Sequence, residues 1–118
     1  MKALLAFSSG GGSGFPGSPV AGVYAAGTAP EFLSVCAAVV AVQYSIVVDI
    51  AAGGLLWYSD GSQMILLGGT VLDSSEYPTP GTQGGIVFSI PSTVAIYNND
   101  SGQFVYFDGT DWQALSGN

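Results

Sequence analysis

Residues 54–64 read GLLWYSDGSQM, and residues 102–112 read GQFVYFDGTDW. The two stretches share a glycine, a tyrosine and an Asp-Gly pair at a constant spacing of 48 residues (108 − 60 = 48). Asp-Gly between apolar or aromatic runs is a strong signal for a tight hairpin turn. We therefore expect each stretch to form a glycine-marked turn, an aromatic strand, an Asp-Gly turn and a closing strand.

The repeat extends outward from these turns to residues 45–67 and 93–115, and each unit ends on a leucine. A short apolar run precedes each aromatic strand at the same spacing. Two such units predict an all-β fold, a small antiparallel β-sandwich or barrel-like body of roughly six to eight short strands. Residues 77–81, YPTPG, are irregular and are expected to connect the units.

The apolar run over residues 35–50 is rich in Val, Ile and Tyr. These residue types favour strands, so we expect two strands with a turn near Gln43. A helix over residues 31–42 is the competing interpretation, since alanines favour helices. The run lacks the polar face of a surface helix, which argues for strands.

The N-terminal part of the chain differs from the rest in composition. Residues 8–14 are glycine and serine alone, and two prolines follow at Pro16 and Pro19. Such a segment favours extended backbone and cannot pack a core. Apolar residues flank it, so we expect residues 1–30 to be an extended arm that orders against a partner, and residues 31–118 to be the β-rich body. A disordered terminus is the alternative.

Charged residues make up 8% of the chain, against roughly 25% in ordinary domains. A surface with so few charges is expected to be covered by other chains. Lys2 is the one basic residue against eight acidic ones. Nucleic acid and anionic membranes are therefore not expected partners. Residues 32–48 are short for a membrane span and crowded with β-branched valines.

The chain has no histidine and a single cysteine, Cys36. It therefore lacks an imidazole to activate a nucleophile and the ligands of a transition-metal site. We expect no enzyme activity, cofactor or metal, and a buried Cys36. Asp60 and Asp108 resemble a carboxylate pair, but turn geometry explains both. A calcium loop at Asp100, Asp108 and Asp111 lacks the full ligand pattern.

Several aromatic and apolar residues are candidates for contacts with other chains, because Tyr and Trp are enriched in interfaces. Alternation along each strand should send one set to the core and the other to a partner. A platform for a sugar ring, built from Trp57, Tyr58, Tyr106, Phe107 and Trp112, is the alternative. The expected interface residues are Leu4, Leu5, Phe7, Phe15, Val20, Tyr24, Trp57, Tyr106 and Trp112.

The second unit, over residues 93–115, resembles a hairpin pattern found in virion proteins of tailed bacteriophages. There a strand with Tyr leads into Asp-Gly-Thr, any residue, Trp and a small hydrophobic strand, as in Tyr106, Asp108–Thr110 and Trp112 here. The resemblance is weaker over residues 45–67, where Met64 stands in place of Trp. The pattern defines a building unit rather than an activity.

The resemblance implies a capsid decoration, or cement, protein on the surface of a virion, made in the host cytoplasm. Proteins of that kind are often near this length and commonly trimeric, with a β body and a flexible arm. The implied partners are the major capsid protein and further copies of the chain. A short tail fibre or adhesin module that binds a host-surface glycan is the second expectation.

Overall fold

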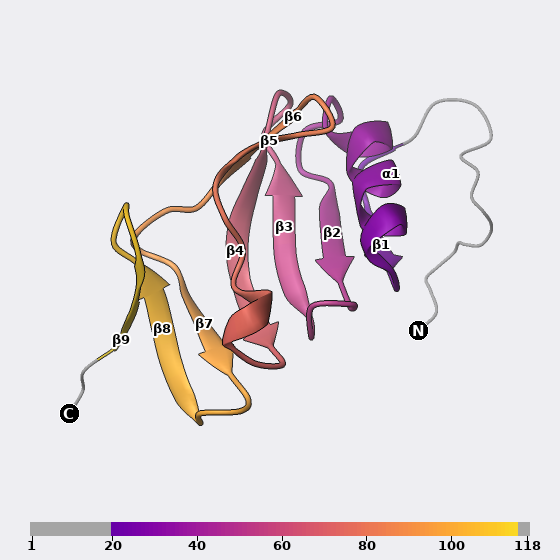
Figure 1. Ribbon diagram of the computed structural model, residues 1–118. Coiled ribbons are helices and arrows are strands. Elements are labelled where there is room, and N and C mark those ends of the chain that lie inside the picture. Colours follow the sequence, from indigo (N-terminus) through magenta and orange to yellow (C-terminus); the bar gives the residue numbers. More distant parts are fainter. Residues whose placement is uncertain (1–19, 116–118) are drawn as a thin grey trace.

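The computed structural model describes residues 20–115, which form one sheet with a helix against it (Figure 1). The helical elements are α1 (Ala29–Val39) and the short 3₁₀ helix η1 (Ser74–Glu76). The strands are β1 (Val23–Ala26), β2 (Ile46–Asp49), β3 (Leu55–Ser59), β4 (Met64–Val71), β5 (Gly81–Gln83), β6 (Ile86–Ser89), β7 (Ala95–Asn98), β8 (Gln103–Phe107) and β9 (Trp112–Ala114).

The sheet is open and mixed. Its main order is β1-β2-β3-β4-β7-β8-β9, and β6 and β5 branch from β4. Strand β1 runs parallel to β2, and β4 runs parallel to both β6 and β7, whereas the other pairs are antiparallel. The β-rich class is confirmed. The antiparallel sandwich or barrel form is not, because parallel pairs join the segments and the sheet is open.

The two Asp-Gly hairpins of the expected repeat have equivalent registers. Strand β8 occupies the positions of β3 plus 48, and both Asp-Gly turns close with equivalent pairs, Ser59 with Met64 and Phe107 with Trp112. The pairing of the preceding strands differs by one position. Ile46 pairs with Tyr58, but in the second unit Ala95 pairs with Tyr106, although Val94 is the residue equivalent to Ile46. Five residues separate β2 from β3 and four separate β7 from β8, so the shorter loop shifts the register.

Helix α1 corrects the expectation of two strands within residues 35–50. Thr28 caps the helix, since its Oγ1 accepts the N–H of Glu31 at 3.2 Å. Glu31 Oε1 in turn accepts the N–H of Gly27 at 2.7 Å, and Pro30 lies in the first turn. These features are the start signal of a helix, closely similar to a capping box. A polar face is not needed, because the outer side is lined by small residues such as Ser34 and Ala37.

The expected boundary of the N-terminal arm at residue 30 also needs correction. Strand β1 pairs with β2 along its whole length, from Val23 opposite Ile46 to Ala26 opposite Asp49. Helix α1 begins at Ala29. The folded body therefore includes part of the expected arm, because this segment supplies the apolar Tyr24 and Ala26 to the core side of the sheet. The other part, residues 1–19, lies outside the described residues.

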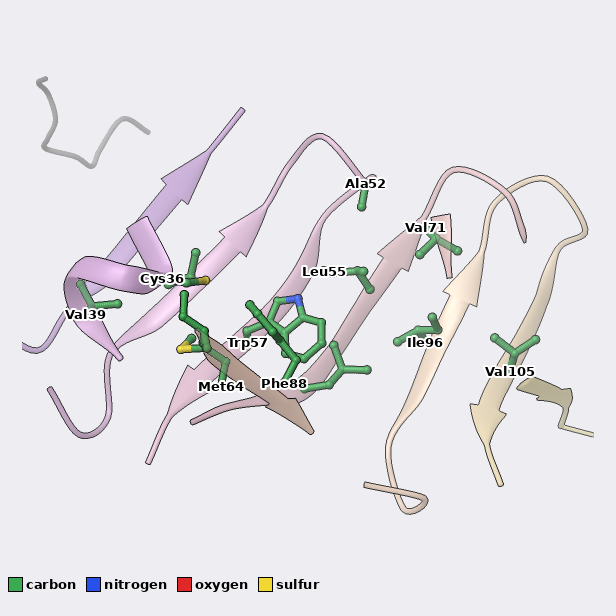
Figure 2. Packing of buried hydrophobic residues seen from close by; sticks show 13 residues of the cluster. Cys36, Val39, Ala52, Leu55, Trp57, Met64, Val71, Phe88, Ile96 and Val105 are labelled. Carbon is green, nitrogen blue, oxygen red and sulfur yellow. The ribbon is translucent and has the colours of Figure 1, made fainter. Parts of the chain in front are cut away.

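The core lies between one face of the sheet and the elements packed on it (Figure 2). Trp57 of β3 packs edge-on against Phe88 of β6, with ring centroids 5.3 Å apart. Phe32 of α1 contacts both rings, at 6.2 and 5.8 Å. Toward the other end of the sheet, Val71, Ile96 and Val105 continue the same layer. Aromatic packing therefore ties α1 and β6 to the middle of the sheet.

Strand β4 passes very close to the β2–β3 loop. Gly69 pairs with Leu55 and Gly68 with Leu56, and the pairing shifts between Leu56 and Trp57. Gly69 has φ +117°, and a Cβ built there would lie 2.3 Å from the carbonyl oxygen of Gly54. No other residue type fits at that position.

Replacing Gly69 with alanine tests this close approach. We expect Gly69→Ala to lower the free energy of unfolding by about 2 kcal/mol more than Gly54→Ala, because overpacking adds to backbone strain. Gly54 is a matched control, since its φ is +122° and a Cβ there meets nothing within 4 Å. Urea denaturation followed by circular dichroism measures both variants. Equal losses would show that the close approach is not a constraint.

Candidate interaction surface

The side of the sheet opposite α1 is apolar and carries no helix or strand of the described residues. Its side chains alternate with buried ones along each strand, and none of them belongs to the core cluster or to the residues packed against it. We call this surface the bare face. Its apolar members are Val23, Ala25, Ile46, Val48, Leu56, Tyr58, Ile65, Ala95, Tyr97, Phe104 and Tyr106.

Strand register assigns these residues to one face. Tyr58 pairs with both Ile46 and Ile65, so three neighbouring strands present a continuous apolar row. Tyr106 pairs with Ala95 in the second half. Directly paired side chains lie on the same side of a sheet. The bare face therefore crosses both repeat units.

The bare face is accessible at both ends of the sheet. Val23 of β1 is 58% exposed and Phe104 of β8 is 54% exposed. The ring of Phe104 packs edge-on against Tyr97, with centroids 4.9 Å apart. The members in the central strands are partly exposed, because their neighbours in the sheet flank them. Soluble proteins seldom leave so large an apolar surface open unless another molecule binds it.

All eight carboxylates of the chain lie in the described part, and none occupies a strand position on the bare face. Asp49 pairs with Ala26 and Leu55, both buried, and so lies on the core side. The others lie in turns or in the helical segments; they are Glu31, Asp60, Asp73, Glu76, Asp100, Asp108 and Asp111. Residues 20–115 contain no Lys, Arg or His, so these carboxylates have no cationic side chain within the described part.

The Asp-Gly turns account for Asp60 and Asp108. Asp108 Oδ1 accepts the N–H groups of Asp111 and Thr110, each at 2.8 Å, and these bonds lower the pKa of its carboxyl group. Asp60 accepts the N–H groups of Ser62 and Gln63 in the same way, and its pKa is also lowered. Both carboxylates are thus anchored by the backbone of their own turn. In residues 20–115, no group of three or more acidic, Cys or His side chains is placed to hold a metal ion.

The expectation that Trp57 lies in an interface is wrong. Its side chain is 3% exposed and lies in the core, so it has no surface to offer a partner. Trp112 lies on the same side of the sheet and is partly buried. Its ring centroid is 5.4 Å from that of Phe107 and 5.4 Å from that of Tyr77. Its indole N–H donates to the carbonyl oxygen of Pro78 at 2.9 Å. Trp112 thus holds the connecting segment against the second repeat unit.

Of the other expected interface residues, Tyr106 lies on the bare face, whereas Tyr24 packs against the core. The hydroxyl of Tyr24 donates to the carbonyl oxygen of Val20, which is 71% exposed. Leu4, Leu5, Phe7 and Phe15 lie outside the described residues.

The expected sugar platform is divided between the two faces. Trp57, Phe107 and Trp112 lie on the core side, and Tyr58 and Tyr106 lie on the bare face. The five rings therefore form no single stacking surface.

Sequence reasoning did not identify most of the bare face. The sequence pattern predicts strands over Ile46, Val48 and Leu56 but no partner contact for them. A signal was present, because residues 46–48 and 55–58 are apolar at successive positions instead of alternating with polar ones. Such runs indicate strands that are covered on both faces.

Cys36 lies in the core as expected. It is fully buried, and burial, with a smaller effect from the charge of Asp49, raises the pKa of its thiol to about 12. A thiol in this state is a poor nucleophile. No helix within residues 20–115 has the length and hydrophobicity to cross a membrane.

Comparisons with protein-family models, with curated proteins and with solved structures give no significant match to this chain.

Two carboxylates should respond to pH in opposite directions. Burial raises the pKa of Asp49, the charge of Glu76 raises it further, and the N–H of Ala52 partly opposes both. Asp49 thus stabilises the fold only when protonated, below its unfolded pKa near 3.8, and this contribution is lost as the pH rises through the folded value. Asp108 has a lowered pKa, so its contribution is present at neutral pH and lost in acid.

We expect Asp49→Asn to raise the free energy of unfolding at about pH 7 and Asp108→Asn to lower it. Both differences should shrink as the pH falls and the carboxyl groups become protonated, first for Asp49, whose pKa is raised, and later for Asp108, whose pKa is lowered. Urea titrations at decreasing pH measure the effect, and each variant is a control for the other because both remove one negative charge. A shift of the same sign in both variants would contradict the assignment.

Proposed function

We propose that this chain is a structural protein of a tailed-phage particle, a decoration protein that binds the capsid shell and further copies of itself. The observation that carries the proposal is the bare face, a continuous apolar surface without a carboxylate in a chain that otherwise carries a net charge of −7. An apolar surface of this kind serves stable contact with another protein surface.

The chemistry of the described residues supports a contact protein. The aspartates of both Asp-Gly turns are engaged by backbone N–H groups, and the single thiol is buried. The resemblance of residues 93–115 to phage hairpin units supports the virion setting. The low charged fraction supports a surface that is largely covered after assembly.

Copy number tests this proposal. Peptides of the chain should be quantified by mass spectrometry in purified tailed-phage particles that contain it, relative to the major shell protein. A decoration protein is expected at roughly hundreds of copies per particle, because it repeats with the shell lattice. A tail protein of known copy number is the internal control. A few dozen copies or fewer would contradict the proposal and favour a fibre.

The expected role of the N-terminal arm in binding gives a second prediction. A chain that starts at Val20 keeps every described element, since β1 begins at Val23. We expect it to fold with an unchanged circular dichroism spectrum and to be lost from shells during washing at least about tenfold faster than the full chain. Equal retention of the two proteins on shells would contradict a binding role for the N-terminal arm.

A further inference from the structure

We propose that the bare face is occupied by the bare face of a second copy of this chain, related to the first by a two-fold axis. This inference builds on the proposed function and names the partner of the surface described above. The result is a two-layer sandwich in which each chain contributes one sheet and its helix α1 lies on the outside.

Charge is the first argument for a second copy. Each described body carries eight carboxylates and no cation, so two copies repel each other wherever acidic surfaces meet. The bare face is the one sheet face without a carboxylate at its strand positions, since Asp49 points to the core side. Pairing through the bare faces leaves the acidic turns of both copies around the contact, where water screens them.

The shape of the sheet is the second argument. Two sheets pack face to face when their twists match, at about 10 Å separation and an angle near −30°. A second copy has the same twist by identity. The apolar members of the bare face also run from Val23 in β1, at one edge of the sheet, to Phe104 and Tyr106 in β8. An isologous contact can therefore use both repeat units of each chain.

The polar groups of the bare face also suit a second copy. Its polar side chains are Tyr58, Tyr97 and Tyr106, together with Thr70, which pairs with Tyr97, Ser89, which pairs with Ile65, and Gln113, which pairs with Tyr106. Most of them carry a hydroxyl group, and the amide of Gln113 likewise both donates and accepts. A hydroxyl both donates and accepts hydrogen bonds, so it can bond to its equivalent in a second copy. A face built only of donors or of acceptors would need a different partner.

Two other occupants compete for this surface. Residues 1–19 of the same chain could cover it, which would leave the full chain monomeric. A three-fold arrangement, implied by the resemblance to decoration proteins, would bring each bare face against two neighbours. The mass in solution separates these alternatives from a two-fold pair.

The experiment is sedimentation equilibrium of the full chain at about 1 to 100 µM, the range in which moderate affinities are resolved. We expect twice the 11.9 kDa of one chain. Ile65→Glu places a charge in the central strand of the bare face, and Phe104→Glu places one at its exposed end. Each should raise the Kd at least about 100-fold, because it buries like charges in both copies.

The matched control is Ala37→Glu. It adds the same charge at an exposed position of α1, on the opposite side of the sheet, and should leave the dimer intact. Circular dichroism confirms that each variant is folded, and Phe104→Glu is the safer variant because its side chain is already 54% exposed. Both tryptophans lie on the core side, so their fluorescence should not change when the dimer dissociates on dilution.

A monomeric full chain across this range, a trimer, or a dimer that tolerates both bare-face charges would overturn the inference. Binding to shells is measured separately with the same proteins. A dimer that never binds shells would contradict the decoration function and leave the pairing standing. A monomer that binds shells would contradict the pairing and leave the function standing.

Discussion

The two halves of the sheet are joined by β4, and their connection depends on the close approach of this strand to the β2–β3 loop. β4 pairs with β3 from Met64 to Gly69, with β6 at Met64 and Ile65, and with β7 at Thr70 and Val71. It can do so because Gly68 and Gly69 allow the backbone to turn with positive φ and to come near Gly54. Thr70 then donates its N–H to Gly54 at 3.1 Å, and Asn99 donates to Val71 at 3.0 Å. One strand without side chains at two positions thus joins both repeat units.

The hairpins were predictable from the sequence because their signals are local. An Asp-Gly turn determines its own hydrogen bonds, and the same bonds recur at Asp60 and Asp108. The parallel pairing of β4 with β7 was not predictable in this way, since no local pattern states which distant strand becomes a neighbour. The prediction of strands where helix α1 lies was wrong for a different reason. The start signal of the helix lies at Thr28–Glu31, but residues 31–42 lack the polar face of an ordinary surface helix, which favours a prediction of strands.

The interface prediction shows the same limit. Alternation along β3 correctly separates Trp57 from Tyr58, but it does not say which of the two faces the core. That choice is made by α1 and β6, whose Phe32 and Phe88 pack on Trp57. Tyr58 and Tyr106 are left on the other side. The enrichment of tryptophan in interfaces therefore did not show which face Trp57 takes, whereas the position of helix α1 does.

The distribution of charge links the fold to its use. Residues 20–115 contain carboxylates and no basic side chain, so the described elements form no ion pairs with one another, and packing and backbone hydrogen bonds stabilise the sheet. Carboxylates are then tolerated where water or backbone N–H groups solvate them, as in the turns, and are costly where a sheet face is buried. The core side excludes them by burial, and the partial burial of Asp49 raises its pKa. Exposure to water would impose no such exclusion on the bare face. Its lack of charge is therefore best explained by contact with a second apolar surface.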